Sequence, residues 1–422
     1  MHPSRSSSIS KLGACSAILL CALLASGCAT QSLNSARHNF YSGQFDRAED
    51  LLSSEETIPE RNRVLFLMER GMVRQMQGEY DESTDDFIAA YERLRELETY
   101  SLSRGAGSLV INDNIQDFVG YPYERTLLHA YTAKNHIASG RWNDTGVEAR
   151  RIIHSLSEDS RRKYPDEPYS RYLSALILEL TGDTANSEMQ YRLVDEQVTS
   201  VNIDPRTGRL AKAKPRTGNG KEDNEDADAG NHDEQEVNPQ EPIEYWDREL
   251  VVFIQLGRSA RPLRYSEGTG HTYAEIHSGG QYLGRSYTLS DTTALARKSE
   301  DARAALSAAK TAGRFVVKES IAAGVESGSD HIAGDLVRLV LFGLLERPDN
   351  RRWETLPRRL QVARVPIQGD IDSYDIVLKD AQGDTIRTIT VNQPMNRYRN
   401  TYISFFRDRP MPGYLMTRSG QN

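Results

Sequence analysis

The sequence predicts two folded domains behind a short leader: an N-terminal all-α domain of helical repeats and a C-terminal α+β domain with a β-sandwich-like sheet. Three observations predict this architecture. Glycine and aromatic residues recur at a helical-hairpin spacing in the first half of the chain. Apolar, β-branched runs separated by turn residues fill the second half, and a segment with almost no apolar residues lies between them. A chain of 422 residues is long enough to form two cores.

The leader, residues 1–27, is typical of a lipoprotein signal peptide. Arg5 and Lys11 precede an uncharged apolar run that is far shorter than the roughly 20 residues needed to span a bilayer. The tetrapeptide Ala25-Ser26-Gly27-Cys28 resembles the bacterial lipobox. We therefore expect cleavage before Cys28 and a lipid anchor on it. The alternative is an ordinary cleaved signal with an incidental cysteine.

All three cysteines lie at or before Cys28, so the mature chain would have no thiol for a disulfide, for thiol catalysis or for a cysteine-based zinc site. Ala29 stands where an aspartate would resemble the inner-membrane retention signal of enteric-type bacteria. We therefore expect an outer-membrane protein that faces the periplasm. The formal net charge of −8, without a basic stripe, argues against nucleic-acid binding.

Residues 28–200 predict tetratricopeptide-like repeats. In "YSGQFDRAEDLL" and "MQGEYDESTDDF", a glycine is followed by an aromatic, a small and an apolar residue at the same spacings, and the two glycines, Gly43 and Gly78, lie one repeat of about 34 residues apart. Fainter copies surround Gly140 and Gly182. We expect each glycine to end a first helix in a left-handed cap, so that a second helix packs closely against it. A plain helical bundle is the alternative.

An insert over Ser108–Ile137 interrupts the repeat period and contains the candidate site. Its polar and aromatic residues would form either a binding loop on the concave side of a solenoid or a capping knot, in which Asp113 or Asn114 accepts from the free N–H groups of a helix and Glu124 pairs with an arginine. The structural interpretation is the one we favour. The candidate partner-binding residues are Asn112, Asp113, Asn114, Tyr121, Glu124 and Arg125.

Three patches of sequence resemble a family of uncharacterised bacterial lipoproteins with tetratricopeptide-like helical repeats. The matching residues are Asn112, Asp113, Asn114, Tyr121, Glu124, Arg125, His129 and Tyr131; Val147, Glu148, Arg150 and Arg151; and Trp353, Leu356 and Pro357. The resemblance implies helical repeats and an envelope location, and it suggests the cell-wall synthesis machinery as a partner class. It implies no particular activity.

Residues 201–243 predict a disordered linker, because a basic stretch followed by an acidic one offers almost no apolar surface to bury. A calcium loop starting at Asn224 does not fit the EF-hand pattern. Its glycine falls one place late, and Gln235 stands where the pattern requires glutamate. We expect a solvated tether.

Residues 244–422 predict the α+β domain with a helical insertion. The expected strands are "ELVVFIQLG", "HTYAEIH", "GQYLGRSYTL", "LQVARVPI", "SYDIVLKD", "DTIRTITVN" and "TYISFF". Helices are expected over Thr293–Phe315 and His331–Glu346. The second of these is too short to span a membrane, and we expect it in the core, with a partner-docking hairpin as the alternative.

Signatures of catalysis are missing from the sequence: it has no Gly-x-Ser-x-Gly, no His-Glu-x-x-His, no phosphate loop and no complete Gly-x-Gly-x-x-Gly. His271, Tyr273, Glu275 and His277 would share one strand face, but the two histidines lie roughly 20 Å apart along an extended strand, too far for one metal ion. We expect a polar strand edge there. We therefore expect no enzyme activity, no metal and no cofactor.

The sequence thus predicts an outer-membrane lipoprotein that acts as a protein-binding scaffold or adaptor in envelope assembly, with its repeats as the binding surface. The alternative is a protein that binds or hydrolyses peptidoglycan through the C-terminal domain, which would require convergent carboxylates or a metal site in a cleft. A purely structural spacer is a third interpretation.

Overall fold

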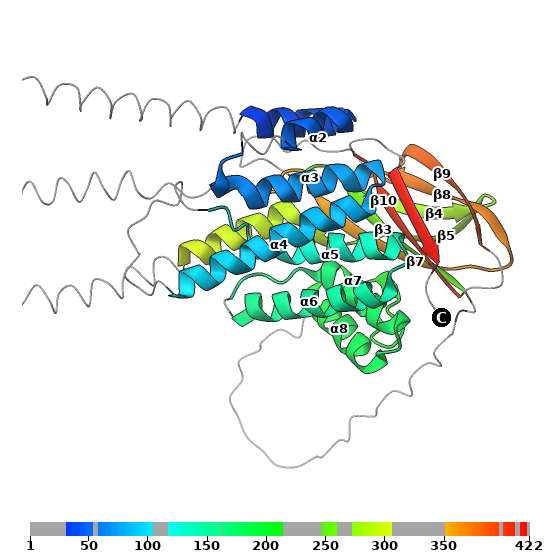
Figure 1. Cartoon of the computed structure of the whole chain (residues 1–422). Helices are drawn as coiled ribbons and strands as arrows, with labels where there is room; N and C mark the ends of the chain where they lie inside the picture. Colours follow the sequence, from blue (N-terminus) through cyan, green and yellow to red (C-terminus); the bar gives the residue numbers. More distant parts are fainter. Residues whose placement is uncertain are drawn as a thin grey trace, which may run out of the picture.

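Helices built from the first half of the chain lie against one face of a mixed sheet, and a second sheet covers the other face (Figure 1). The structure is a computed structural model that describes residues 31–53, 58–103, 117–161, 163–213, 246, 248–259, 272–305, 351–395, 400–409 and 414–419. The N-terminal part is all-α and the C-terminal part is α+β, as the sequence predicts. Within the described residues, no helix has both the length and the apolar character needed to cross a membrane.

The helical layer is a series of antiparallel helix pairs. A helix over residues 31–41 is followed by α2 (Phe45–Ser53), a short 3-10 turn η2 (Glu60–Asn62), α3 (Arg63–Gln77), α4 (Tyr80–Ser103), α5 (Pro122–Ala138), α6 (Trp142–Arg161), α7 (Pro168–Leu180) and α8 (Thr184–Gln197). A further helix over residues 292–305 comes from the C-terminal part of the chain. It is the described part of the helix expected over Thr293–Phe315. The helix expected over His331–Glu346 lies outside the described residues.

Each predicted glycine cap is present. Gly43, Gly78, Gly140 and Gly182 have φ angles of 73°, 84°, 72° and 86°. At each one, the glycine N–H donates to the carbonyl three residues back, and the next N–H donates to the carbonyl five residues back, which is the Schellman pattern. The fifth residue after each glycine is at most 3% exposed: Ala48, Ser83, Thr145 and Ser187. The shared hairpin frame is therefore confirmed as geometry, and its assignment to tetratricopeptide repeats stays a prediction.

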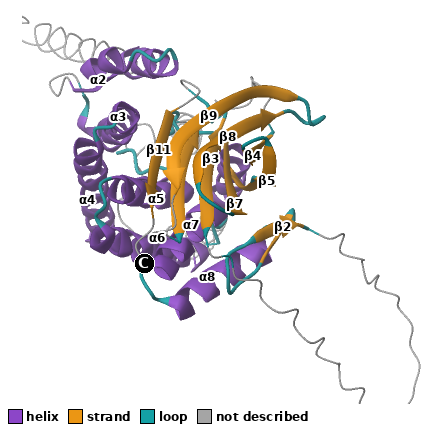
Figure 2. Ribbon diagram, turned by 90° about the vertical axis from the view of Figure 1, so that its right-hand side faces the viewer, coloured by secondary structure: helices purple, strands orange, loops and turns teal. Residues whose placement is uncertain are grey.

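Two sheets form the β layers, packed face to face (Figure 2). The five-stranded sheet has the order β11-β10-β3-β7-β6, with β3 (Glu249–Leu256), β6 (Tyr287–Asp291), β7 (Arg359–Pro366), β10 (Thr401–Arg407) and β11 (Tyr414–Ser419). The four-stranded antiparallel sheet has the order β5-β4-β8-β9, with β4 (Tyr273–Ser278), β5 (Gln281–Arg285), β8 (Ile371–Lys379) and β9 (Thr385–Met395). All the expected strands are present, and the sequence reading missed β11.

Strand β3 explains the order of the layers, because both of its faces are buried. Val251 and Phe253 face the helices, where the rings of Tyr169 and Phe253 lie 5.5 Å apart, edge to face. Leu250, Val252 and Ile254 face the four-stranded sheet and pack in a second core with residues of β4 and β8. A strand buried on both faces has a continuous apolar sequence instead of an alternating one, as β3 does.

The helical part and the sheet part share a hydrophobic core, which changes the expected domain organisation. One continuous cluster of buried residues contains helical side chains such as Tyr131 and Tyr172 together with Phe253, Leu360 and Phe405 of the five-stranded sheet. Two separate domains over 28–200 and 244–422 would each have a core of their own. The two ranges differ in sequence pattern, but their buried side chains pack into one shared core. The helices need the sheet to bury their inner face.

The predicted linker begins with ordered structure, so the expectation of disorder from residue 201 onward is wrong for its first part. Strands β1 (Val201–Ile203) and β2 (Leu210–Lys212) form an antiparallel hairpin. Val201 and Ile203 are buried, whereas Asn202 between them is exposed. The apolar alternation is too short to stand out in a charged segment. The stretch 214–245 lies outside the described residues.

Arg364 of β7 connects the layers through a buried ionic cluster. Its guanidinium donates to Glu249 of β3 at 2.6 and 2.8 Å, to Glu179 of α7 at 2.7 and 3.1 Å, and to the hydroxyl of Tyr191 in α8 at 3.1 Å. The Arg364 side chain is 3% exposed. Two carboxylates and a hydroxyl around one guanidinium satisfy a buried charge that would otherwise cost several kcal/mol.

Candidate functional site

The structure describes half of the predicted site. Tyr121, Glu124 and Arg125 lie at the start of α5. Cys28, Asn112, Asp113 and Asn114 lie outside the described residues, as does His271. The site must therefore be built from the N-terminus of α5 and from what packs against it.

Glu124 caps its own helix. Tyr121 is the N-cap residue with an extended backbone, Pro122 follows at the first helical position, and the Oε2 atom of Glu124 accepts a hydrogen bond from the Tyr121 N–H at 2.7 Å. This is the carboxylate half of a capping box. The capping group is thus Glu124, which we expected to pair with an arginine while Asp113 or Asn114 made the cap. Its second hydrogen-bond partner is the backbone N–H of Trp353.

The other oxygen of Glu124 binds a distant segment, which we call the strap and define as residues 351–358. Glu124 Oε1 accepts from the Trp353 N–H at 2.8 Å. Glu69 of α3 binds the next two amides: its Oε1 accepts from the Glu354 N–H at 3.0 Å and its Oε2 from the Thr355 N–H at 3.2 Å. Two buried carboxylates therefore hold three consecutive amides of the strap.

The carbonyl groups of the strap are bound as well. Arg37 donates to the Arg352 carbonyl at 2.5 Å, and the Tyr41 hydroxyl donates to the Glu354 carbonyl at 2.8 Å. Arg407 of β10 donates to the Thr355 carbonyl. Because burying an unpaired backbone group costs about 1–3 kcal/mol, this pattern is what allows an irregular segment to run between the helices and the sheet.

Trp353 anchors the strap. It is 1% exposed, and its ring centroid lies 5.7 Å from that of Phe87 in α4 and 5.5 Å from that of Tyr131 in α5. Two sequence patches far apart in the chain, Tyr121–Arg125 and Trp353–Pro357, are thus brought into contact by the fold.

A second cluster of polar side chains lies between α5 and α6. His129 Nδ1 lies 2.8 Å from Glu148 Oε2, and Arg151 donates to the other oxygen of Glu148 at 2.5 Å. Burial by itself would raise the pKa of Glu148, but the hydrogen bond and charge of His129 and the charge of Arg151 outweigh burial and lower that pKa. The His129 ring lies edge-on to Tyr91 at 4.7 Å. These contacts join three helices.

Arg125 belongs to the outer surface of this region. It donates to Glu98 at 2.6 Å, and its guanidinium lies 3.6 Å from Asp159. It therefore links α4, α5 and α6 and does not reach the strap. The cap expected from Asp113 or Asn114 lies outside the described residues, and the described residues instead show Glu124 capping α5.

The chemistry open to this site is limited by its own hydrogen bonds. Glu69 and Glu124 are both 0% exposed, and each of their four oxygens accepts at least one hydrogen bond from the protein. Burial raises the pKa of Glu124 to about 7, against the lowering effect of the Tyr121 and Trp353 amides. The two carboxylates hold the backbone and present no open oxygen to a substrate.

Sequence reasoning missed Glu69 and Arg37 as members of the site. Arg37 donates to Glu69 at 2.7 Å, and its side chain is 5% exposed. Glu69 follows the apolar run Val64–Met68, and all five of these residues are buried. A lone carboxylate directly after such a run is the signal that would have marked it.

Lys134 of α5 is the most unusual titratable group among the described residues. Its side chain is 0% exposed, its Nζ has no hydrogen-bond partner, and it lies 4.1, 4.8 and 5.7 Å from the ring centroids of Tyr131, Tyr169 and Phe405. Burial, and secondarily the charge of Arg407, lowers the pKa of Lys134 far below its ordinary value. Burial of the unpartnered amine in the shared core therefore disfavours its charged form.

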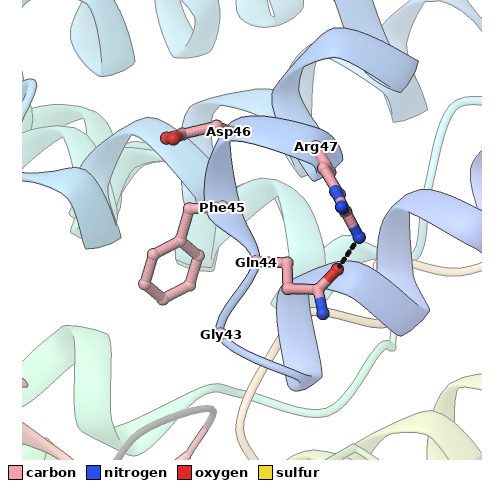
Figure 3. Close-up of a pocket in the computed structure, with 5 residues that line it drawn as sticks. All are labelled: Gly43, Gln44, Phe45, Asp46 and Arg47. Atoms are coloured by element: carbon pink, nitrogen blue, oxygen red, sulfur yellow. Dashed lines mark hydrogen bonds between the residues drawn. The ribbon is translucent and has the colours of Figure 1, made fainter.

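A surface hollow of about 370 Å³ lies at the turn before α2, lined by Gly43, Gln44, Phe45, Asp46 and Arg47 (Figure 3). Arg47 donates to the Gln44 side chain at 2.9 Å, and the Asp46 side chain points away from this pair. The hollow is open and follows from the helix-to-helix turn. Its polar groups do not converge on a common point, so it is a weak candidate for a ligand site.

No group of three or more His, Cys, Asp or Glu side chains in the described part of the chain is arranged to hold a metal ion. Comparison with models of known protein families gives no match, and comparison with curated proteins gives none either.

Proposed function

We propose that this protein is a lipid-anchored scaffold of the bacterial outer membrane that faces the periplasm and acts by binding another envelope protein. Cys28 would carry the anchor, and the helical pairs would provide the binding surface. The cell-wall synthesis machinery is the first partner class to test. The repeats would be of the tetratricopeptide-like type, as their spacing and glycine caps suggest.

The observation that carries this proposal is the way the helical layer holds the strap. Arg37, Glu69 and Glu124 bind the backbone of an extended segment, and Phe87 and Tyr131 receive its Trp353 side chain. Helical repeats use this mode to bind extended segments of partners. Here the inner face is taken by the chain's own strap and sheet, so a partner would use the outer face.

Two exposed apolar side chains favour α6 and α8, which we call the outer helices, as the contact surface. Val147 of α6 is 43% exposed and Met189 of α8 is 46% exposed. Among the side chains of the helical layer whose burial the structure describes, these are the large apolar ones that are exposed. Apolar residues and methionine are enriched at the centres of protein interfaces.

The anchor is tested first. Cells producing the full chain are labelled with a clickable fatty acid, and the protein is followed in membrane fractions. We expect label and outer-membrane sedimentation for the wild-type chain, and loss of both for Cys28→Ala. An unlabelled wild-type chain would reject the anchor.

The scaffold is tested by capture from membranes solubilised in mild detergent, with Cys28 intact. Deleting the repeats would destroy the shared core, so point variants are required. We expect a partner that is retained by Ile386→Glu, a control exposed to 44% on β9, and lost with Val147→Glu combined with Met189→Glu. Equal capture by both variants would reject the outer helices as the surface.

A further inference from the structure

The outward face of the four-stranded sheet carries an ordered set of polar and aromatic side chains. Ala274 and Ile276 of β4, and Ile376 and Leu378 of β8, point into the core. Because side chains alternate along a strand, the residues between them point outward. The outward residues are Tyr273, Glu275 and His277 on β4, Tyr282 and Arg285 on β5, and Asp375 and Lys379 on β8. The face lies on the side of the molecule away from the helices (Figure 1).

Tyr282 projects from this face. Its side chain is 52% exposed. The His277 ring supports it edge-on, with centroids 5.5 Å apart. A ring held by its neighbour on one side and open on the other is a ready platform for stacking, since its position is fixed before a ligand arrives.

Charged groups of both signs surround this platform and are held in place by one another. Glu275 Oε2 lies 3.0 Å from His277 Nε2 and 3.6 Å from Lys379 Nζ. The Arg285 guanidinium lies over the Tyr273 ring at 3.9 Å. The face therefore offers fixed donors and acceptors side by side, next to an open aromatic ring.

We propose that this face binds a glycan chain, with a sugar ring stacked on Tyr282 and its hydroxyl and acetamido groups bound by Glu275, His277 and Lys379. Hydroxyl groups both donate and accept, so they match a surface that alternates carboxylates with cations. A polyanion would be repelled by Glu275 and Asp375, and an apolar peptide would remove the charged groups of this face from water without giving them new hydrogen bonds. A neutral ligand with many hydroxyl groups therefore fits this face best. That the physiological chain is the N-acetylhexosamine backbone of the cell wall rests on the envelope location proposed above.

The full-length lipidated protein in detergent micelles is titrated with chitohexaose by calorimetry and sedimented with purified cell-wall sacculi. We expect both to bind, and we expect Tyr282→Ala to weaken chitohexaose binding about tenfold and to release the protein from sacculi. Ile386→Ala, on the opposite edge strand of the same sheet, is the matched control and should bind as the wild type does. Far-ultraviolet circular dichroism verifies that both variants are folded.

The outcomes separate this proposal from the scaffold. If the wild type binds sacculi but not chitohexaose, and Tyr282→Ala binds neither, the site is supported and requires a glycan chain longer than six sugars. No binding of either probe, or equal binding by Tyr282→Ala and the wild type, overturns it. Tyr282→Ala should capture the protein partner as well as the wild type does, because Val147 and Met189 are unchanged. The glycan site and the scaffold are therefore tested independently of each other.

Discussion

Glu124 and Trp353 are 229 positions apart in the chain, and the carboxylate of the first accepts the backbone N–H of the second at 2.8 Å. The same carboxylate caps α5 through the Tyr121 N–H. One buried side chain thus fixes both the start of a central helix and the path of the strap between the layers.

Trp353→Ala should be among the most destabilising single changes in the protein. Truncating a fully buried tryptophan removes its contacts with Phe87 and Tyr131 and leaves a cavity, which costs about 3–5 kcal/mol. Urea unfolding followed by circular dichroism measures this loss. Trp142→Ala, at a half-buried position at the start of α6, is the control and should cost clearly less. Similar losses for both would contradict the anchoring role.

The stability contributed by Glu124 should depend on pH. Burial raises its pKa to about 7 from an ordinary value of 4.5, so the folded protein binds this proton more tightly than the unfolded chain. The favourable contribution is fully present below pH 4.5 and is lost as the pH rises through about 7, a change of about 3 kcal/mol at most.

The Glu124→Gln variant isolates this effect. Glutamine does not titrate, whereas Asp408, whose pKa burial raises to about 6, and Lys134 are the same in both proteins and cancel in the difference. The stability advantage of the wild type over Glu124→Gln, from urea unfolding, should be larger at pH 5 than at pH 8. A difference that is constant with pH would refute the raised pKa.

Lys134→Met should stabilise the protein. The change replaces an unpartnered buried amine by an apolar side chain of similar length among Tyr131, Tyr169 and Phe405. Removing an unsatisfied polar group from a core is worth about 1–2 kcal/mol, seen as a higher urea midpoint. Lys212→Met, the same change at an exposed site on β2, should have little effect. Destabilisation by Lys134→Met would mean that the amine has a favourable role.

Gly71→Ala tests the close packing of α3 on α4. Alanine is the better helix former by about 1 kcal/mol, but its Cβ would lie 2.5 Å from the Phe87 ring. We expect a net loss of about 2 kcal/mol, because the ring has little room to move. In the Phe87→Leu background, the same substitution should cost less. An equal cost in both backgrounds would show that the contact with Phe87 is not the cause.

Much of the local structure was readable from the sequence, because its signals are local. The four glycines predict the helix ends, since a left-handed cap requires only the backbone of its own turn. The apolar run of β3 predicts a strand buried on both faces. The cap made by Glu124 had a local signal too, because Tyr121 and Glu124 are three positions apart, but we expected Asp113 or Asn114 to make the cap.

What the sequence did not predict depends on contacts between distant segments. Glu69 and Arg37 join the strap only because α3 and the helix over residues 31–41 lie beside it. The shared core of helices and sheet is likewise set by packing, and amphipathic helices alone do not specify what covers them. The charged composition around β1 and β2 obscured a hairpin that a few buried side chains stabilise.

The central claim, a scaffold that contacts a partner through its outer helices, is tested most directly by site-specific photo-cross-linking in living cells. A photoreactive amino acid replaces Val147 or Met189 in the chain with Cys28 intact, and Ile386 serves as the control position. We predict the same cross-linked envelope protein from positions 147 and 189 and none of it from 386, with loss of the product when Cys28 is changed to alanine. Absence of any cross-link from both helix positions, in cells where the anchored protein is abundant, would contradict the account.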